Sequence, residues 1–537
     1  MTRFAGEDVM LTRLMLIDLV SGAMEVLGEK FRAFEGDNLI HVAEDGSFAL
    51  VGVQRTIYDY PSVVRYELTP GGDAEVVQSP ITGVWQWYAD DAGVVRLGLG
   101  YKNRALRIHY RTGPEDKFRL IEKIKEGEFE EKFWDVRQIV SGSDQSYVLR
   151  EGENGRVGLY LFDLATREPI ETVFEHPEQD LDAVLMRDGK PLGVYYVDDR
   201  DRVHWFDEEY DRLYKALNTA LGEEEAWVVS RAEDNSRMIV WAGGASDPGA
   251  YYVYSANEKR LDLLMELRPG IVEGQLARPR AVSYTARDGT KIRAYLTLPR
   301  GREAKGLPLI ILPHGGPFGV RDKLDYDDQV QLLANRGYAV IQPNFRGSGG
   351  YGDAFFELGT GQIGRGMQDD LDDAMDWAVA EGFADRDRVC VVGSSYGGYA
   401  ALWSVIRNPE RYRCAASFVG VTDWDLMLKY DKRYFTRKAG KKWAQRVTGE
   451  EDFDLDTVSP YRLAHTLTRP VLLAHGKEDT NVPWSQFKKF RSAAKDAAIA
   501  PVELLFEEEG HGFDKPENEQ RWFEELIAFL ARHNPAD

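Results

Sequence analysis

The sequence predicts two domains of different fold class: an all-β N-terminal domain, and a C-terminal domain of alternating strands and helices around a mostly parallel sheet. Its 537 residues exceed one ordinary domain. Short strands and Asp/Gly turns fill the first half, and from about Arg278 apolar strands alternate with amphipathic helices. We therefore expect domains at residues 1–275 and 278–537.

The N-terminal half contains a loose repeat in which an apolar strand, a turn and another strand recur. The repeats are centred on Asp18, Glu67, Arg111, Asp163, Asp207 and Ser255. Successive residue numbers in this series differ by 49, 44, 52, 44 and 48. Periods of about 40 to 50 residues with several strands each are typical of β-propeller blades. A β-sandwich is the alternative, but the number of repeats favours a propeller.

The first repeat begins only a few residues before its turn at Asp18, so we expect an incomplete first blade. Two explanations stay open: the ring closes in an unusual way, or the chain starts inside a longer parent. In the second case a targeting segment would have been lost.

The C-terminal domain is predicted to open with a hairpin and to continue as a parallel sheet. Residues 284–298 form the hairpin, which turns at Asp288-Gly289. Strands follow at residues 309–312, 339–342, 389–392, 414–418, 471–474 and 502–506, with helices such as 369–380 and 520–531 between or after them. This alternation is typical of a mostly parallel sheet.

The most informative motif is Gly393-Ser394-Ser395-Tyr396-Gly397, between the apolar run 389–392 and a helix-like segment, residues 400–406. A nucleophilic serine on a sharp strand-to-helix turn needs neighbours two residues away that have no side chain. The alternative, a turn of small residues, becomes improbable because the partners of such a serine follow in the sequence. The motif therefore predicts Ser395 as a nucleophile.

Ser395 needs an acid and then a histidine later in the chain, which is the order of the α/β-hydrolase fold. Asp479 follows the strand at 471–474, and His511 lies between two glycines after the strand at 502–506. His465 and His475 precede the acid, so order argues against them, and His533 lies in the C-terminal tail. We expect a catalytic triad of Ser395, Asp479 and His511 in an α/β-hydrolase domain.

The developing oxyanion in such a site needs two preorganised donors. The backbone N–H of Tyr396, next to the nucleophile, is predicted to be one. The other should come from the loop after the strand at 307–313, which reads His314-Gly-Gly-Pro317. An ordinary tight turn is the alternative, but the position of the loop favours the oxyanion role.

Composition excludes several function classes. The net charge of −22 argues against nucleic acid or an anionic membrane as a partner and disfavours acidic substrates. No apolar run reaches the length of a membrane span, and the first residues lack the core of a signal peptide.

Cys390 and Cys414 are expected to be buried free thiols. A cytoplasmic location fits, or a periplasmic or secreted one if the N-terminus is truncated. No metal or organic cofactor is expected, and the sequence is compatible with a homo-oligomer.

Five motifs in order resemble the prolyl oligopeptidase family of serine peptidases, most closely its acylaminoacyl-peptidase branch. They lie at residues 314–317, 344–352, 393–399, 475–479 and 510–513. The resemblance covers residues 278–535 and implies the same triad, with the Tyr396 and Gly316 amides as the oxyanion hole. It also implies a propeller that restricts entry to short or unfolded peptides.

One position departs from the acylaminoacyl branch. That branch often has an arginine where this chain has Asn481, and the dipeptidyl-peptidase branch has an asparagine there, which can bind a substrate carbonyl. The dipeptidyl branch also holds the substrate amino group with a pair of propeller glutamates. Residues 130–131, 208–209 and 223–225 are candidates by type only. Acidic pairs are more often solvated turns.

A substrate pocket is expected beside Ser395. Its predicted walls come from Trp424, Met427 and Tyr430, together with Tyr396, Asn481 and Val482. Aromatic residues at this spacing are more often core than pocket. The mild expectation is an apolar or aromatic residue before the scissile bond, with Arg346 in a structural role near the site.

The leading hypothesis is a serine peptidase that acts on short peptides, as an exopeptidase releasing acylated residues or dipeptides. The alternative is an esterase or a specialised isopeptidase that uses the same triad. A propeller binding module with an inactive hydrolase is disfavoured because every triad member is present.

Overall fold

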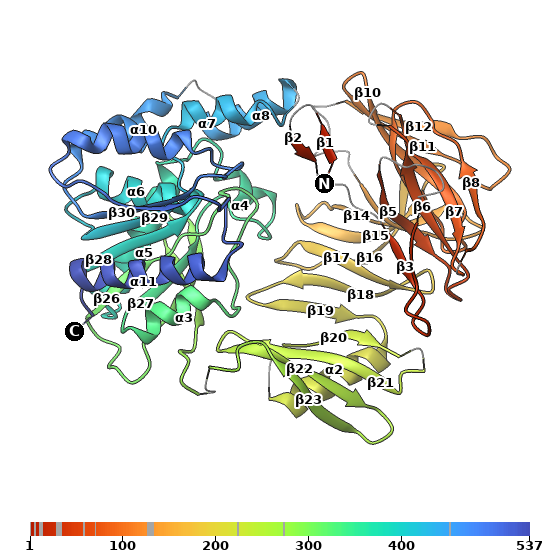
Figure 1. The fold of residues 1–537 in the computed structure, drawn as a ribbon, viewed down its shortest axis with the longest axis horizontal. Helices are drawn as coiled ribbons and strands as arrows, with labels where there is room; N and C mark the ends of the chain where they lie inside the picture. The colour runs from red at the N-terminus through yellow and green to blue at the C-terminus, as the bar shows by residue number, and fades with distance from the viewer. Residues whose placement is uncertain are drawn as a thin grey trace. The chain divides into compact units, whose positions relative to one another are not determined.

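The computed structural model describes residues 2–4, 7–9, 14–27, 35–56, 59–69, 71–125, 134–222, 225–232, 234–271, 274–435, 437–449 and 453–536. The chain forms two compact units (Figure 1). One comprises residues 1–196 and 203–207, and the other comprises residues 197–202 and 208–537. The predicted domain limits, 1–275 and 278–537, stay a prediction.

The first unit consists of small antiparallel sheets. Two hairpins pair β1 (Thr2–Phe4) with β2 (Glu7–Val9), and β3 (Met15–Ile17) with β4 (Met24–Val26). The first four-stranded sheet holds β5 (Glu35–Val42), β6 (Phe48–Gln54), β7 (Ser62–Glu67) and β8 (Ala74–Gln78). The second holds β9 (Val84–Ala89), β10 (Val95–Lys102), β11 (Ala105–Tyr110) and β12 (Arg119–Lys125). The third holds β13 (Asp135–Ile139), β14 (Gln145–Glu151), β15 (Val157–Asp163) and β16 (Glu168–Phe174).

The predicted repeat marks the same point in successive sheets, where the third strand turns toward the fourth. β7 ends at Glu67, β15 ends at Asp163, and Arg111 directly follows β11. Asp18 lies in the turn between β3 and β4. The prediction of propeller-type antiparallel sheets is therefore confirmed.

One repeat departs from the pattern because a helix replaces the fourth strand. After β17 (Leu181–Arg187), β18 (Lys190–Val197) and β19 (Asp201–Trp205), the turn at Asp207 leads into α2 (Glu208–Leu221). The sequence analysis did not foresee this helix.

The second unit contains one more antiparallel sheet, against which α2 packs. Its strands are β20 (Glu225–Arg231), β21 (Arg237–Gly244), β22 (Asp247–Ser255) and β23 (Arg260–Glu266). Leu217 of α2 shares a buried apolar cluster with Ala226 and Val240. The last predicted repeat, Ser255, is again the end of a third strand.

The main body of the second unit is an eight-stranded sheet in the order β24-β25-β27-β26-β28-β29-β30-β31. The strands are β24 (Arg280–Thr285), β25 (Lys291–Thr297), β26 (Leu307–Ile311), β27 (Ala339–Asn344), β28 (Ala384–Ser394), β29 (Cys414–Phe418), β30 (Val471–Gly476) and β31 (Val502–Phe506). β25 runs antiparallel to both of its neighbours, and the pairs from β27 to β31 are parallel. The predicted hairpin and all six predicted strands are present.

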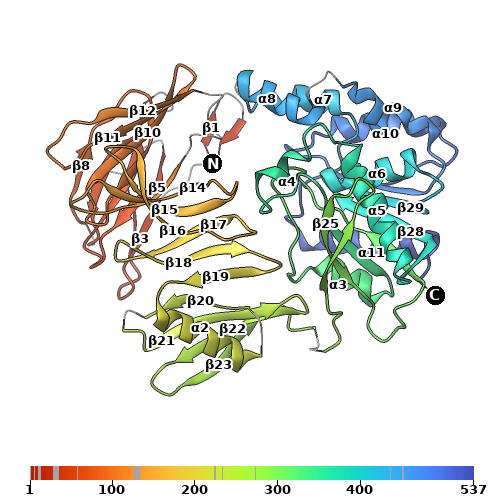
Figure 2. The ribbon, with the colours of Figure 1, turned by 180° about the vertical axis from the view of Figure 1, so that it is seen from behind.

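Helices cover both faces of this sheet (Figure 1 and Figure 2). They are α3 (Asp328–Asn335), α4 (Asp353–Glu357), α5 (Gly366–Ala380), α6 (Tyr396–Arg407), α7 (Trp424–Asp431), α8 (Arg437–Thr448), α9 (Pro460–Leu463), α10 (Ser485–Ala493) and α11 (Pro516–His533). Within the described residues, none of these helices has both the length and the apolar character needed to cross a membrane.

The central strands β26, β27, β29 and β30 are buried on both faces because most of their residues are apolar. In β28, Val389 and Val391 belong to the core shared with α5 and α6. Cys390 and Val392 belong to the opposite core, shared with α3 and α11. This alternation explains why the strand reads as a continuous apolar run, and it confirms the predicted α/β sheet.

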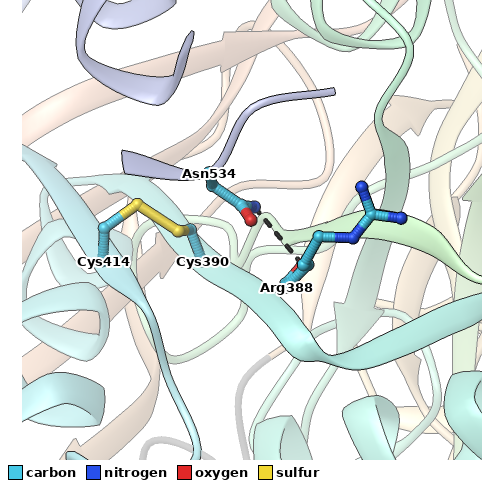
Figure 3. The surroundings of a disulfide bond; sticks show 4 residues. All are labelled: Arg388, Cys390, Cys414 and Asn534. Carbon is cyan, nitrogen blue, oxygen red and sulfur yellow. Dashed lines mark hydrogen bonds between the residues drawn. A yellow bond between two sulfur atoms is a disulfide. The ribbon is translucent and has the colours of Figure 1, made fainter. Parts of the chain in front are cut away.

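The expectation of two free thiols is wrong, because Cys390 and Cys414 form a disulfide (Figure 3). The two residues are register partners in the adjacent parallel strands β28 and β29, with Cα atoms 4.8 Å apart. That separation lies in the range that a disulfide requires. Near this bond, the Asn534 side chain donates a hydrogen bond to the Arg388 carbonyl at 3.3 Å. Strand register, which the sequence did not reveal, brings the two sulfurs together.

Candidate active site

Ser395 lies on a sharp turn between β28 and α6, in a backbone conformation that side-chain-bearing residues rarely adopt. Its φ is 58° and its ψ is −120°. A Cβ on Gly393 would lie 2.4 Å from the carbonyl carbon of Gly397, and one on Gly397 would lie 2.2 Å from the Pro313 oxygen. Only glycine fits at both places, so the motif reflects a steric requirement of the turn. The Ser395 N–H donates to the Phe418 carbonyl at 3.0 Å, which ties the turn to β29.

Asp479 and His511 come together after neighbouring strands of the sheet. Asp479 follows β30, and its Oδ1 accepts hydrogen bonds from the backbone N–H groups of Asn481 and Val482 at 2.8 and 2.9 Å. Its Oδ2 lies 2.8 Å from His511 Nδ1. With Nδ1 held by the carboxylate, the Nε2 lone pair of a neutral imidazole is left to accept a proton. The Asp479 side chain is fully buried, whereas 27% of the His511 side chain is exposed.

His475 supports the loop that carries Asp479. Its Nε2 lies 2.9 Å from the Val482 carbonyl, and burial lowers the pKa of its imidazole. A neutral ring that donates to this carbonyl fixes the bend between β30 and Val482. Of the other histidines set aside from sequence order, His465 lies in a short 3-10 turn and His533 is the last residue of α11.

The loop after β26 runs beside the nucleophile. A Cβ on Gly315 would lie 3.5 Å from the Ser395 Cβ. The buried His314 ring stacks on Phe345 at 4.2 Å and contacts Ser348 Oγ through Nε2 at 2.8 Å. Burial lowers the pKa of His314 to about 4, so its imidazole is neutral at pH 7. These contacts fix the loop that carries Gly316.

Gly316 and Tyr396 line the same pocket as Ser395. Gly316 has a φ of +114°, a conformation that favours glycine. Tyr396 is the first residue of α6, where helix N–H groups have no intrahelical partner. Free N–H groups at a helix N-terminus favour a negative charge.

Arg346 anchors the glycine-rich loop that follows β27. Its guanidinium binds Asp370 of α5 through Nη2 at 2.7 Å and Asp288 of the hairpin turn through Nη1 at 2.7 Å. Its backbone N–H also donates to Asp370, at 2.9 Å. Arg346 is not among the residues that line the pocket at Ser395, so these contacts support its structural interpretation.

A pocket of about 340 Å³ opens beside Ser395. Its lining includes Ser395, His511, Tyr396 and Gly316, and also the predicted wall residues Trp424, Met427, Asn481 and Val482. Tyr430 is not part of the lining, because its hydroxyl donates to the Thr480 carbonyl at 2.7 Å. Burial, together with a hydrogen bond to Tyr434, raises the pKa of Tyr430 to about 12.

Two pocket residues escaped the sequence analysis: Asp431 at the end of α7 and Trp443 of α8. Asp431 follows Trp424 by seven positions and Met427 by four, which places all three on one helix face. That spacing could have identified Asp431. Nothing local to the sequence indicates that Trp443 reaches the same pocket.

Some glutamates are candidates for binding a substrate amino group. Those that lie within the described residues do not line this pocket. Residues 130–131 and 223–224 lie outside the described residues. Glu208 and Glu209 begin α2, and Glu225 is buried in β20. Across the described ranges, no group of three or more His, Cys, Asp or Glu side chains is arranged to hold a metal ion.

Comparison with known families agrees with this geometry. The model of the prolyl oligopeptidase family matches residues 324–535, which include Ser395, Asp479 and His511. Residues 324–535 of the chain are thus similar to the prolyl oligopeptidase family. This agrees with the resemblance carried by the sequence motifs.

Curated relatives of the family bear exopeptidase names. The chain is 34% identical over 323 residues to dipeptidyl aminopeptidase BIII of Pseudoxanthomonas mexicana, covering 58% of this chain and 47% of the relative. It is 30% identical over 328 residues to dipeptidyl peptidase family member 6 of Caenorhabditis elegans, covering 56% and 44%. It is 26% identical to acylamino-acid-releasing enzyme 1 of Oryza sativa subsp. japonica over 46% of this chain and 32% of the relative. The chain spans about half the length of the first two curated relatives.

Solved structures of the family share the fold. A puromycin-hydrolysing peptidase of Mycobacterium tuberculosis superposes with a TM-score of 0.71 at 20% identity, covering 94% of this chain and 80% of that one. An acylaminoacyl peptidase of Pyrococcus horikoshii superposes with a TM-score of 0.61 at 15% identity, covering 97% and 91%. At these identities the likeness concerns the fold.

Proposed function

We propose that the chain is a serine peptidase that cleaves short peptides through an acyl-enzyme, with Ser395, His511 and Asp479 as its catalytic triad. One observation carries the proposal. Ser395, on its strained turn, lines the same pocket as His511, and His511 Nδ1 is held by a buried Asp479 carboxylate. A serine hydroxyl is a weak nucleophile until a base removes its proton, and this arrangement supplies the base.

In the proposed reaction His511 Nε2 takes the Ser395 proton as Oγ attacks the substrate carbonyl. The imidazolium that forms is stabilised by Asp479, and it then protonates the leaving amine. Water repeats the same steps on the acyl-enzyme, with His511 again as the base. The two backbone N–H bonds that Asp479 accepts keep its carboxylate oriented through both halves of the cycle.

The oxyanion is proposed to bind between the backbone N–H groups of Tyr396 and Gly316. The first begins α6, and the second belongs to the loop fixed by His314. Each such donor contributes on the order of 3 kcal/mol to the transition state.

The substrate class that we propose is short peptides, cleaved as an exopeptidase that releases dipeptides or acylated residues. The names of the relatives support this choice, since they include dipeptidyl and acylamino-acid-releasing enzymes. The exposed Asn481 lines the pocket, and its side-chain amide is available to bind a substrate carbonyl. We further propose residues 1–275 as the propeller domain and residues 278–537 as the catalytic domain.

The proposal is tested with chromogenic peptides that carry free, acetylated or dipeptidyl N-termini. Wild type should cleave one of these classes, and Ser395→Ala should cleave none. Hydrolysis of matched esters without any peptide cleavage would move the assignment to an esterase or a specialised isopeptidase.

The compartment and the assembly state are further proposals. The Cys390–Cys414 disulfide favours an oxidising compartment, periplasmic or secreted, over the cytoplasmic location expected from the sequence. Fractionation of the producing cells would decide between the two locations. A homo-oligomer stays a prediction, to be checked by light scattering.

A further inference from the structure

The pocket beside Ser395 combines apolar walls with one carboxylate. Trp424, Met427 and Val421 supply apolar lining, and Asp431 is the only acidic side chain among its lining residues in the described part of the chain. A pocket built only for an apolar side chain has no use for a half-buried carboxylate, whose desolvation is costly. The acid therefore requires a functional explanation.

The Asp431 carboxylate is held in place on one side only. Its Oδ2 accepts a hydrogen bond from the Trp443 indole N–H at 2.8 Å. No lysine or arginine of the described residues forms an ion pair with it, although Lys432 and Arg433 follow it directly in sequence. The Arg433 guanidinium lies over the Tyr430 ring instead, at 5.0 Å. The exposed lysines of α8 do not line the pocket either.

We propose that Asp431 selects substrates with a lysine or arginine immediately before the scissile bond. The pocket begins at Ser395 and the proposed oxyanion donors, so the side chain next to the reacting carbonyl is the one that enters it. A lysine or arginine places its aliphatic stem against Trp424 and Met427 and its cation on the free oxygen of Asp431. This inference rests on the peptidase activity proposed above and names its substrate class.

The charge of the whole chain also agrees with a cationic substrate. The net charge of −22 raises the local concentration of cations near the protein. Burial raises the pKa of Asp431, while the hydrogen bond from Trp443 lowers it, and a bound cation would favour the ionised form further. The apolar preference expected from the sequence alone is thereby refined: most of the lining is apolar, but one lining side chain is acidic.

The test compares lysine with norleucine, its uncharged counterpart, before a 4-nitroanilide. Four substrates are used: acetyl-lysyl, acetyl-norleucyl, glycyl-lysyl and glycyl-norleucyl nitroanilides. The ratio of kcat/KM for lysine over norleucine should be above one in wild type and should fall about 10- to 100-fold in Asp431→Asn. Asp425→Asn is the matched control, since Asp425 is an exposed acid on the same helix and does not line the pocket.

The outcomes separate the two proposals. Measurable hydrolysis of the norleucine substrates by Asp431→Asn shows that the variant is folded and that the triad works, so a lower ratio supports the inference. An equal ratio in wild type and Asp431→Asn overturns it. Slower cleavage of both glycyl substrates but of neither acetyl substrate also overturns it, because Asp431 would then recognise the substrate amino group. If wild type cleaves none of the four, the proposed function fails first.

Discussion

Replacing Arg346 by Met should destabilise the catalytic domain severely, because it leaves a buried carboxylate without its cation. Asp370 is fully buried, and 8% of the Arg346 side chain is exposed. Burial raises the pKa of Asp370, and the Arg346 guanidinium opposes this rise. Removing one partner of such a buried pair costs about 3–5 kcal/mol in the free energy of unfolding.

A second arginine, which binds a carboxylate of the same helix α5, provides a matched control. Arg287 binds Asp373 of α5 at 2.7 Å, but 47% of its side chain is exposed. The Arg287 side of this pair is open to solvent, which screens the interaction, so Arg287→Met should cost less than Arg346→Met. The difference between the two variants isolates the effect of burial.

The assay is urea unfolding followed by circular dichroism and by loss of peptide hydrolysis. Arg346→Met should unfold at a much lower urea concentration than Arg287→Met. The difference between their unfolding midpoints should decrease at low pH, where Asp370 can be protonated. Arg346→Met/Asp370→Asn should recover part of the loss, since it removes the unpaired charge. Equal costs for the two single variants would refute the reasoning.

Three further predictions concern the disulfide, a buried acid and the nucleophile turn. Denatured, unreduced protein should contain no reactive thiol, and reduction should expose the two thiols of Cys390 and Cys414. Because this disulfide joins residues 24 positions apart, its reduction should lower the free energy of unfolding by about 3 kcal/mol. Two reactive thiols before reduction would contradict the structure. Burial raises the pKa of Glu225 to about 7, so the protonated form, which the folded state favours, is lost between about pH 4.5 and 7. Glu225→Gln should therefore increase the free energy of unfolding by up to about 3 kcal/mol at pH 8 and raise the melting temperature. At pH 4.5 the same substitution should change stability little. An equal gain at both pH values would contradict this. Gly397→Ala should lower kcat/KM at least about 100-fold, because its Cβ would displace the neighbouring loop. Gly512→Ala is the control and should be nearly neutral, since its Cβ would meet no atom within 4 Å. Similar activity in the two variants would contradict this prediction.

The features that the sequence predicted are those encoded by local patterns. The glycines of the Ser395 turn and the apolar runs of the parallel strands follow from chemistry within a few residues. The order of Asp479 and His511 is read directly along the chain. The predicted repeat positions Glu67, Arg111, Asp163 and Ser255 likewise lie where the third strand of a sheet turns toward the fourth.

The features that the sequence missed depend on how distant segments meet. The disulfide requires the register of β28 against β29, which no local pattern reveals. Helix α2 takes the place of a strand because its apolar face packs against β20 and β21. Trp443 lines the pocket at Ser395 from a separate helix. Tyr430 does not line it, and its hydroxyl donates a hydrogen bond to the Thr480 carbonyl.

The most direct test of the central claim is covalent labelling with a fluorophosphonate probe, followed by mass spectrometry of the labelled peptide. The probe reacts only with an activated serine, and Ser394 next to the proposed nucleophile is an internal control. The account predicts modification of Ser395 in wild type and in Ser394→Ala, slower labelling in His511→Ala, and none in Ser395→Ala. Labelling that persists in Ser395→Ala, or a folded wild type that does not react, would contradict it.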